Sequence, residues 1–205
     1  MLFTLQELFD VVMMTLGVGF IFMDSFGLRQ QITRIKSYEE DPVAYYQSAL
    51  KRKIPGFDWR ALWIACIITA PAVIFHEVAH KIVAISLGMQ ATFHAAYTWL
   101  IIGIIMKYLI GFVFFIPGYV THTGVATPLQ EAAIAFAGPA LNGILWVVAW
   151  LMLKYKPAKM SSRTVQILVA MRYINGFLFI FNMIPIGPFD GAKVFEGLMQ
   201  YFFMH

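Results

Sequence analysis

The run from Ala61 to Leu87 is apolar almost throughout, yet it carries His76, Glu77 and His80. Its length suits a bilayer crossing, which takes about 20 apolar residues in a helix. Three ionisable side chains in such a helix are costly unless a metal or a polar partner compensates for their burial. Residues four apart lie one turn apart on a helix, so two imidazoles can reach a single Zn²⁺. The segment therefore predicts a membrane-spanning helix with an H-E-x-x-H metal site.

The composition of the whole chain also points to a membrane. Of its 205 residues, 60% are hydrophobic and 13% are charged, and the mean hydropathy is +0.72. The charged share is about half that of an ordinary soluble domain. The basic residues gather in two loops between apolar segments, where they act as topology signals rather than as a nucleic-acid surface. We therefore expect an integral, multi-pass protein of the cell membrane that binds no nucleic acid.

The apolar segments predict an all-α polytopic fold with about five or six transmembrane or re-entrant helices and a small membrane-embedded β element. The first segment contains Glu7 and Asp10, so its first turn is expected at the membrane interface. Besides Ala61 to Leu87, the expected helices are Leu5 to Met23, Leu129 to Leu153, Val165 to Ile184 and Ala192 to His205. Residues 1–60 should form the first span plus a basic extramembrane loop, and residues 61–205 a membrane-embedded core that carries the metal site.

The stretch from Thr98 to His122 does not read as one continuous helix. Glycines interrupt its first half, which predicts a short helix, and its second half from Phe112 is aromatic and β-branched, which predicts a strand. Non-helical backbone is tolerated at membrane depth only where protein or a water-filled cavity surrounds it. The stretch should therefore re-enter the membrane near the metal site. His94 and His122 lack ligand spacing and are expected to be loop residues.

A metal held by two imidazoles needs a third protein ligand and a free position. Cys66 is the single cysteine and lies in a predicted span, so the third ligand should be a carboxylate. Asp190 follows two prolines and a glycine that unwind the chain between apolar segments, and it is the best candidate. Capping of the last helix is the alternative for Asp190, and it is compatible with ligation. Glu131 is the runner-up ligand, for which solvation at the membrane interface is the simpler explanation.

Three motifs stand in order along the chain, and together they resemble the site-2 protease family of intramembrane zinc metalloproteases. They are His76-Glu-Val-Ala-His80, Gly138-Pro-Ala-Leu-Asn142, and Asn182-Met-Ile-Pro185 leading to Asp190-Gly191. The resemblance implies a short member with few additional domains. It implies one zinc ion held by His76, His80 and Asp190, with Glu77 as the catalytic carboxylate. By the same likeness, Asn142 and Asn182 would lie near the substrate, which the edge of the β element would hold in extended form.

The expected function is that of an intramembrane zinc metalloendopeptidase. Its substrate would be a membrane-tethered protein cut in or near a transmembrane segment, as in regulated intramembrane proteolysis. Glu77 can take a proton from water and pass it to the leaving amine. A catalytically inactive scaffold relative and a membrane zinc-binding or transport protein are the alternatives. The sequence leaves the oligomeric state open.

Overall fold

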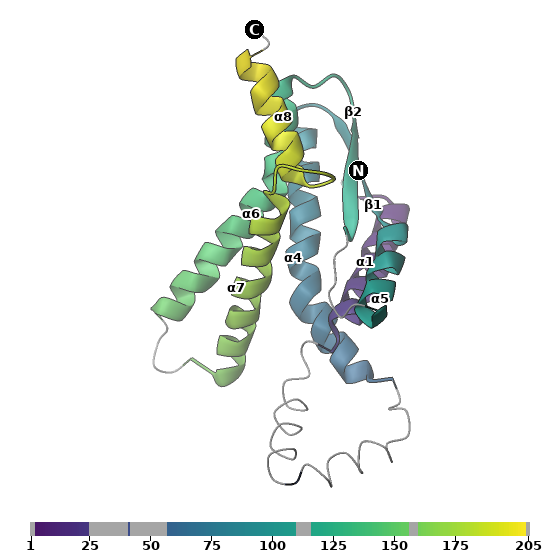
Figure 1. Ribbon diagram of the computed structural model, residues 1–205, viewed down its shortest axis with the longest axis vertical. Coiled ribbons are helices and arrows are strands. Elements are labelled where there is room, and N and C mark those ends of the chain that lie inside the picture. The colour runs from purple at the N-terminus through teal and green to yellow at the C-terminus, as the bar shows by residue number, and fades with distance from the viewer. Residues whose placement is uncertain (1–2, 25–40, 42–56, 110–115, 156–159, 204–205) are drawn as a thin grey trace.

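The computed structural model describes residues 3–24, 41, 57–109, 116–155 and 160–203 (Figure 1). The expected basic loop therefore lies almost wholly outside the described residues, as does the stretch 110–115. In chain order the elements are α1 (Leu5–Phe22), α4 (Trp59–Ser86), β1 (Gln90–Ala95), α5 (Tyr97–Leu109), β2 (Gly118–Thr123), α6 (Pro128–Lys154), α7 (Ser162–Asn182) and α8 (Asp190–Phe203).

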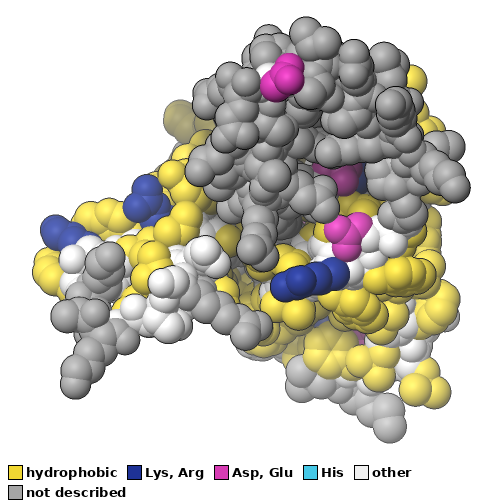
Figure 2. Space-filling model, turned by 90° about the horizontal axis from the view of Figure 1, so that it is seen from below, with side chains coloured by type: hydrophobic (Ala, Val, Ile, Leu, Met, Phe, Trp, Pro, Cys, Tyr) yellow, Lys and Arg dark blue, Asp and Glu magenta, His cyan; other side chains and the backbone are white. Residues whose placement is uncertain are grey.

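Four of the described helices, α1, α4, α6 and α7, are long and apolar enough to cross a membrane. They match the four longest apolar segments of the sequence, whereas α5 and α8 are shorter. Large apolar side chains remain exposed on these helices, among them Trp63, Ile67, Phe75 and Phe177. Seen from below, hydrophobic side chains dominate the described surface (Figure 2). Such a surface suits a lipid environment better than water.

Helix α4 occupies the centre of the fold, with α1 and α5 on one side and α6 and α7 on the other (Figure 1). Asp58 caps its start by accepting the N–H of Ala61 at 3.0 Å. Its end follows the expected signal, because Gly88 has a positive φ of 83° just beyond the helix. Helices α4 and α6 run antiparallel, since His80 meets Ile134 while His76, one turn earlier, meets Asn142.

The β element has two antiparallel strands, β1 and β2, which pair from Gln90 with Thr123 to Ala95 with Gly118. Residues 112–115 of the strand predicted from Phe112 lie outside the described residues, and within the described part β2 covers Gly118–Thr123. Its partner β1 was not predicted. His94 and His122 lie in these strands, so their expected place in loops is wrong. We call this two-stranded element the hairpin, although α5 lies between β1 and β2 in the chain. It lies beside α4 on the side of α1 and α5, and α6 then starts near the end at which α4 stops (Figure 1).

The start of α1 is tied into the protein interior. Thr4 and Glu7 form a capping box, in which Glu7 N–H bonds to Thr4 Oγ1 and Thr4 N–H to Glu7 Oε2. The carboxylates of Glu7 and Asp10 are buried inside the protein, at 1% and 3% exposure. They contact β1 and α4, so the first turn of α1 is part of the protein interior.

Candidate metal centre

His76 and His80 lie one turn apart on α4, and both are buried. Their Nε2 atoms are 3.1 Å apart, so the two imidazoles converge on one point. The H-E-x-x-H spacing on a continuous helix accounts for this geometry. The flanking apolar residues place the pair within a helix of membrane-spanning length.

Asp190 reaches the same point from the other end of the chain. Its Oδ2 lies 3.0 Å from His76 Nε2 and 3.4 Å from His80 Nε2. Helix α7 ends at Asn182, and the turns that follow bring the first residue of α8 over α4. Gly191 allows this approach, because a Cβ there would lie 2.5 Å from the carbonyl oxygen of Met183.

The three atoms fit a tetrahedral zinc site. Bonds of 2.0 to 2.1 Å at tetrahedral angles separate neighbouring ligand atoms by about 3.3 Å. The three separations here are 3.0, 3.1 and 3.4 Å. Within the part of the chain that the structure describes, His76, His80 and Asp190 form the group suited to holding a metal ion. Two imidazoles and one carboxylate also match the ligand chemistry of zinc.

The electrostatics around Asp190 favour its ligand form. Burial opposes ionisation of the carboxyl, but in the metal-free site N–H donation from His76 and His80 outweighs burial and lowers the pKa of Asp190 well below its usual range; a bound metal would take the place of those protons. Asp190 is therefore a carboxylate at neutral pH, the form that binds a metal. It also opens α8, so ligation and a place at the start of a helix are compatible.

Gly138 of α6 makes room for the metal centre. A Cβ at this position would lie 2.7 Å from His76 Nε2 and closer still to His80 Nε2. The side of α6 that faces α4 is therefore hollowed at the ligand atoms themselves. Sequence reasoning quoted this glycine only as part of a motif and missed its role. The available signal was a glycine followed by a proline inside a predicted helix. Both residues weaken a helix, so their presence there indicates a packing reason outside the helix itself.

Two contacts behind the histidines set their tautomers. The Nδ1 of His80 lies 2.7 Å from the carbonyl oxygen of Ile134, which can only accept, so Nδ1 carries the proton. The Nε2 lone pair of His80 is then free for a metal. This backbone contact has no signature in the sequence.

Asn142 plays the same part for His76. Its amide nitrogen Nδ2 lies 3.1 Å from His76 Nδ1, while its buried Oδ1 has no hydrogen-bond partner. A half-turn of the carboxamide exchanges the two atoms, so that Oδ1 accepts the Nδ1–H of His76 and leaves Nε2 unprotonated. Asn142 thus lies behind the imidazole rather than on the wall of the pocket. Its predicted contact with substrate is not tested and has no support from this position.

Glu77, Asn182 and the metal-ligand candidates line one pocket of about 120 Å³. This volume holds several water molecules, since one needs roughly 10 to 15 Å³. Gly118 and Val120 of β2 form part of its wall. The pocket therefore brings together a carboxylate, space for water, a potential metal site and a strand edge. Lys193, one turn after Asp190, also lines the pocket and was not singled out from the sequence.

Glu131 does not join the metal cluster. Its Oε2 lies 3.2 Å from His122 Nε2 at the rim of the same pocket. The runner-up ligand thus has a different partner, and of the two carboxylate candidates Asp190 is the one beside His76 and His80. The ligand, catalytic and substrate roles of these residues stay predictions.

Two curated proteins are similar to this chain. One is "Putative zinc metalloprotease MJ0611" of Methanocaldococcus jannaschii, which is 39% identical over 144 residues, or 69% of this chain and 74% of that protein. The other is "Putative zinc metalloprotease sll0528" of Synechocystis sp., which is 28% identical over 152 residues, or 72% of this chain and 35% of that protein. No protein-family profile matches the chain. No solved structure matches it either.

Proposed function

The chain belongs to the family of zinc metalloproteases for which these two relatives are named, and from this premise we propose that it is an intramembrane zinc endopeptidase. It cuts a peptide bond in or near a transmembrane segment of a membrane-tethered protein. One observation carries the proposal: the His76, His80 and Asp190 atoms that fit zinc share a pocket with Glu77 and with the edge of β2, amid helices of membrane-spanning length.

The protein's own groups divide the work of hydrolysis between them. His76, His80 and Asp190 would hold the ion, with Ile134 fixing the ligand tautomer of His80 and Asn142, once its oxygen faces Nδ1, that of His76. Zinc held there supplies Lewis-acid chemistry, which activates water and polarises a peptide carbonyl. Glu77 takes the proton from the attacking water and returns it to the leaving amine nitrogen.

The β hairpin gives the substrate a place to unwind. A transmembrane helix hides its peptide bonds in hydrogen bonds, so a segment must open before water can attack. In the described part of the chain the sheet has two strands, so the edge of β2 that faces the pocket has no strand beside it. An unwound segment that pairs with this edge replaces its lost hydrogen bonds and brings its carbonyl toward the pocket. Asn182, which also lines the pocket, contacts the bound segment.

A pair of reporter substrates tests this function. One reporter span carries glycine or asparagine near the expected cut, the other is all leucine, and both are reconstituted with the enzyme in liposomes. We expect zinc-dependent cutting of the first and little of the second, because residues of low helix propensity lower the cost of unwinding. Equal cutting of both spans, or cutting of water-soluble peptides alone, would contradict an intramembrane substrate.

A further inference from the structure

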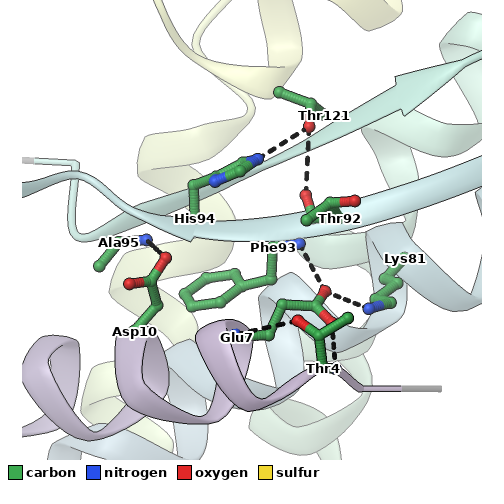
Figure 3. A network of polar contacts seen from close by, with 9 residues as sticks. All are labelled: Thr4, Glu7, Asp10, Lys81, Thr92, Phe93, His94, Ala95 and Thr121. Carbon is green, nitrogen blue, oxygen red and sulfur yellow. Dashed lines mark hydrogen bonds and ion pairs between the residues drawn. The ribbon is translucent and has the colours of Figure 1, made fainter. Parts of the chain in front are cut away.

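Two carboxylates of α1, Glu7 and Asp10, are buried in the protein although the proposed chemistry does not use them. They lie three residues apart, hence on one face of the helix, at 1% and 3% exposure. Buried carboxylates destabilise a fold unless they are well partnered, so their partners show what they hold in place. Figure 3 shows both side chains reaching from α1 to β1.

The partners of both carboxylates include backbone N–H groups of β1. Phe93 N–H donates to Glu7 Oε1 at 2.8 Å, and Ala95 N–H donates to Asp10 Oδ2 at 3.2 Å (Figure 3). Tyr97 adds its hydroxyl, which donates to Asp10 Oδ1 at 2.6 Å. Successive donors on one edge of the strand thus meet successive acceptors on one face of the helix. The match specifies a single register of β1 along α1.

Lys81 connects this arrangement to the helix of the metal centre. Its ammonium group forms an ion pair with Glu7 Oε1 and is 3% exposed (Figure 3). It follows His80 directly on α4. Glu7 therefore ties α1, β1 and the metal-binding segment of α4 together at one point. We call the set Glu7, Asp10 and Lys81 the clamp.

The clamp also determines which backbone groups of β2 face the metal pocket. Alternate residues of a strand direct their backbone groups to opposite edges. The backbone N–H groups of Phe93 and Ala95 point toward α1. In the register of the sheet, these two residues stand opposite Val120 and Gly118. The backbone groups of Gly118, Val120 and His122 therefore point away from β1, and these residues line the pocket.

The position of the hairpin along α4 decides which peptide bond of a paired substrate lies at the metal. A shift of the hairpin by one residue along α4 turns the hydrogen-bonding backbone groups of β2 to the wrong edge. A slip of two residues moves the strand by roughly 6.6 Å, which takes a scissile carbonyl out of reach of the metal site. The hairpin must therefore be held from its far side, and the contacts that do this come from α1.

We propose that Glu7 and Asp10 are positioning residues: by binding the outward N–H groups of β1 they hold the hairpin in one register, so that β2 offers a substrate segment to the metal site at one peptide bond. This inference rests on the proposed proteolytic function and adds that the clamp sets the site of cleavage. A purely structural role would affect stability without changing which bond is cut.

The test compares wild type with Asp10→Leu, Asp10→Asn and Asp58→Ala in liposomes, with the glycine-bearing reporter. Asp10→Leu removes the acceptor, whereas Asp10→Asn keeps an oxygen that can accept the Ala95 N–H. Asp58→Ala is the matched control, because it also removes a carboxylate bonded to a backbone N–H, but at the far end of α4. Product masses locate the cut, and hydrogen exchange of the Ala95 amide follows the hairpin without reference to activity.

For Asp10→Leu we expect the share of product cut two residues from the main bond to rise at least about tenfold, the factor expected for losing a hydrogen bond to a charged group. Exchange of the Ala95 amide should quicken by a similar factor. Wild type, Asp10→Asn and Asp58→Ala should each cut at one bond, and their Ala95 amides should exchange slowly. If Asp10→Leu does not fold, Asp10→Ala takes its place, since the smaller side chain leaves room for water.

An unchanged cut site in Asp10→Leu would overturn the inference even if amide exchange quickens, because a purely structural role predicts that result; equal spreading in Asp58→Ala would overturn it too. If Asp10→Leu does not cut at all, Asp10→Ala is measured in its place, and a single unchanged cut site there overturns the inference. Failure of wild type to cut the reporter would instead refute the proposed function, and the exchange measurement would still decide whether the clamp holds the hairpin.

Discussion

Replacing Gly138 by alanine should remove the metal site while leaving most of the fold intact. The added Cβ would lie 2.7 Å from His76 Nε2, whereas an ordinary contact begins at 3.4 Å. The ring or α6 must therefore move by about 0.7 Å, and His80 must give way even further. Metal–ligand distances tolerate only about 0.2 Å. We expect zinc affinity to fall by about 100-fold or more, beyond the 10- to 100-fold typical of lost supporting contacts.

The assay measures zinc bound after dialysis against a competing chelator, together with the melting temperature of the metal-free protein. Gly143→Ala is the matched control on the same helix, because its Cβ would meet Phe179 at 3.2 Å and no ligand atom. Overpacking costs about 1 to 3 kcal/mol, and the better helix propensity of alanine returns about 1 kcal/mol. Both metal-free variants should therefore melt within a few degrees of wild type. Normal zinc affinity in Gly138→Ala would refute the assignment of the site.

Three further outcomes follow from the same contacts. Asp190→Ala should lower zinc affinity by about 100-fold, whereas Glu131→Ala should leave it unchanged, as measured by chelator competition; equal losses would contradict the ligand set. Asn142→Ala should weaken zinc binding by about 10- to 100-fold, and Asn142→Asp, which keeps an acceptor for His76, should bind better than Asn142→Ala. Removal of zinc from wild type should lower the melting temperature, because free ligand at 100 times its Kd stabilises the folded state by about 2.7 kcal/mol; an unchanged melting curve would count against a bound ion.

Much of the metal centre was predictable because its signals are local. The i, i+4 spacing of His76 and His80 depends only on helix geometry, and Asp190 stood out because prolines and glycine unwind the chain just before it. The long apolar helices were predictable for the same reason. The membrane-spanning character of these helices and the substrate contacts of Asn142 and Asn182 remain predictions.

The strand β1 was missed because its stability comes from distant residues. Gln90 to Ala95 contains few β-branched or aromatic side chains, so local propensity is weak. Its backbone is instead bound by β2 on one edge and by Glu7 and Asp10 on the other. For the same reason the burial of these two acids was not predicted, since their partners in β1 lie more than 80 residues away in the chain. Contacts of this kind leave no periodic pattern in a sequence.

Glu77→Gln tests the central claim most directly, because glutamine keeps the shape of the side chain but cannot carry the proton. Zinc content and cleavage of the glycine-bearing reporter are measured on the same liposome preparation, beside wild type. The account predicts about one zinc ion per chain in both proteins and a rate of cutting about 10²- to 10⁴-fold lower in the variant, the usual contribution of a positioned acid or base. Equal rates in the two proteins, or wild-type protein that cuts without zinc, would contradict it.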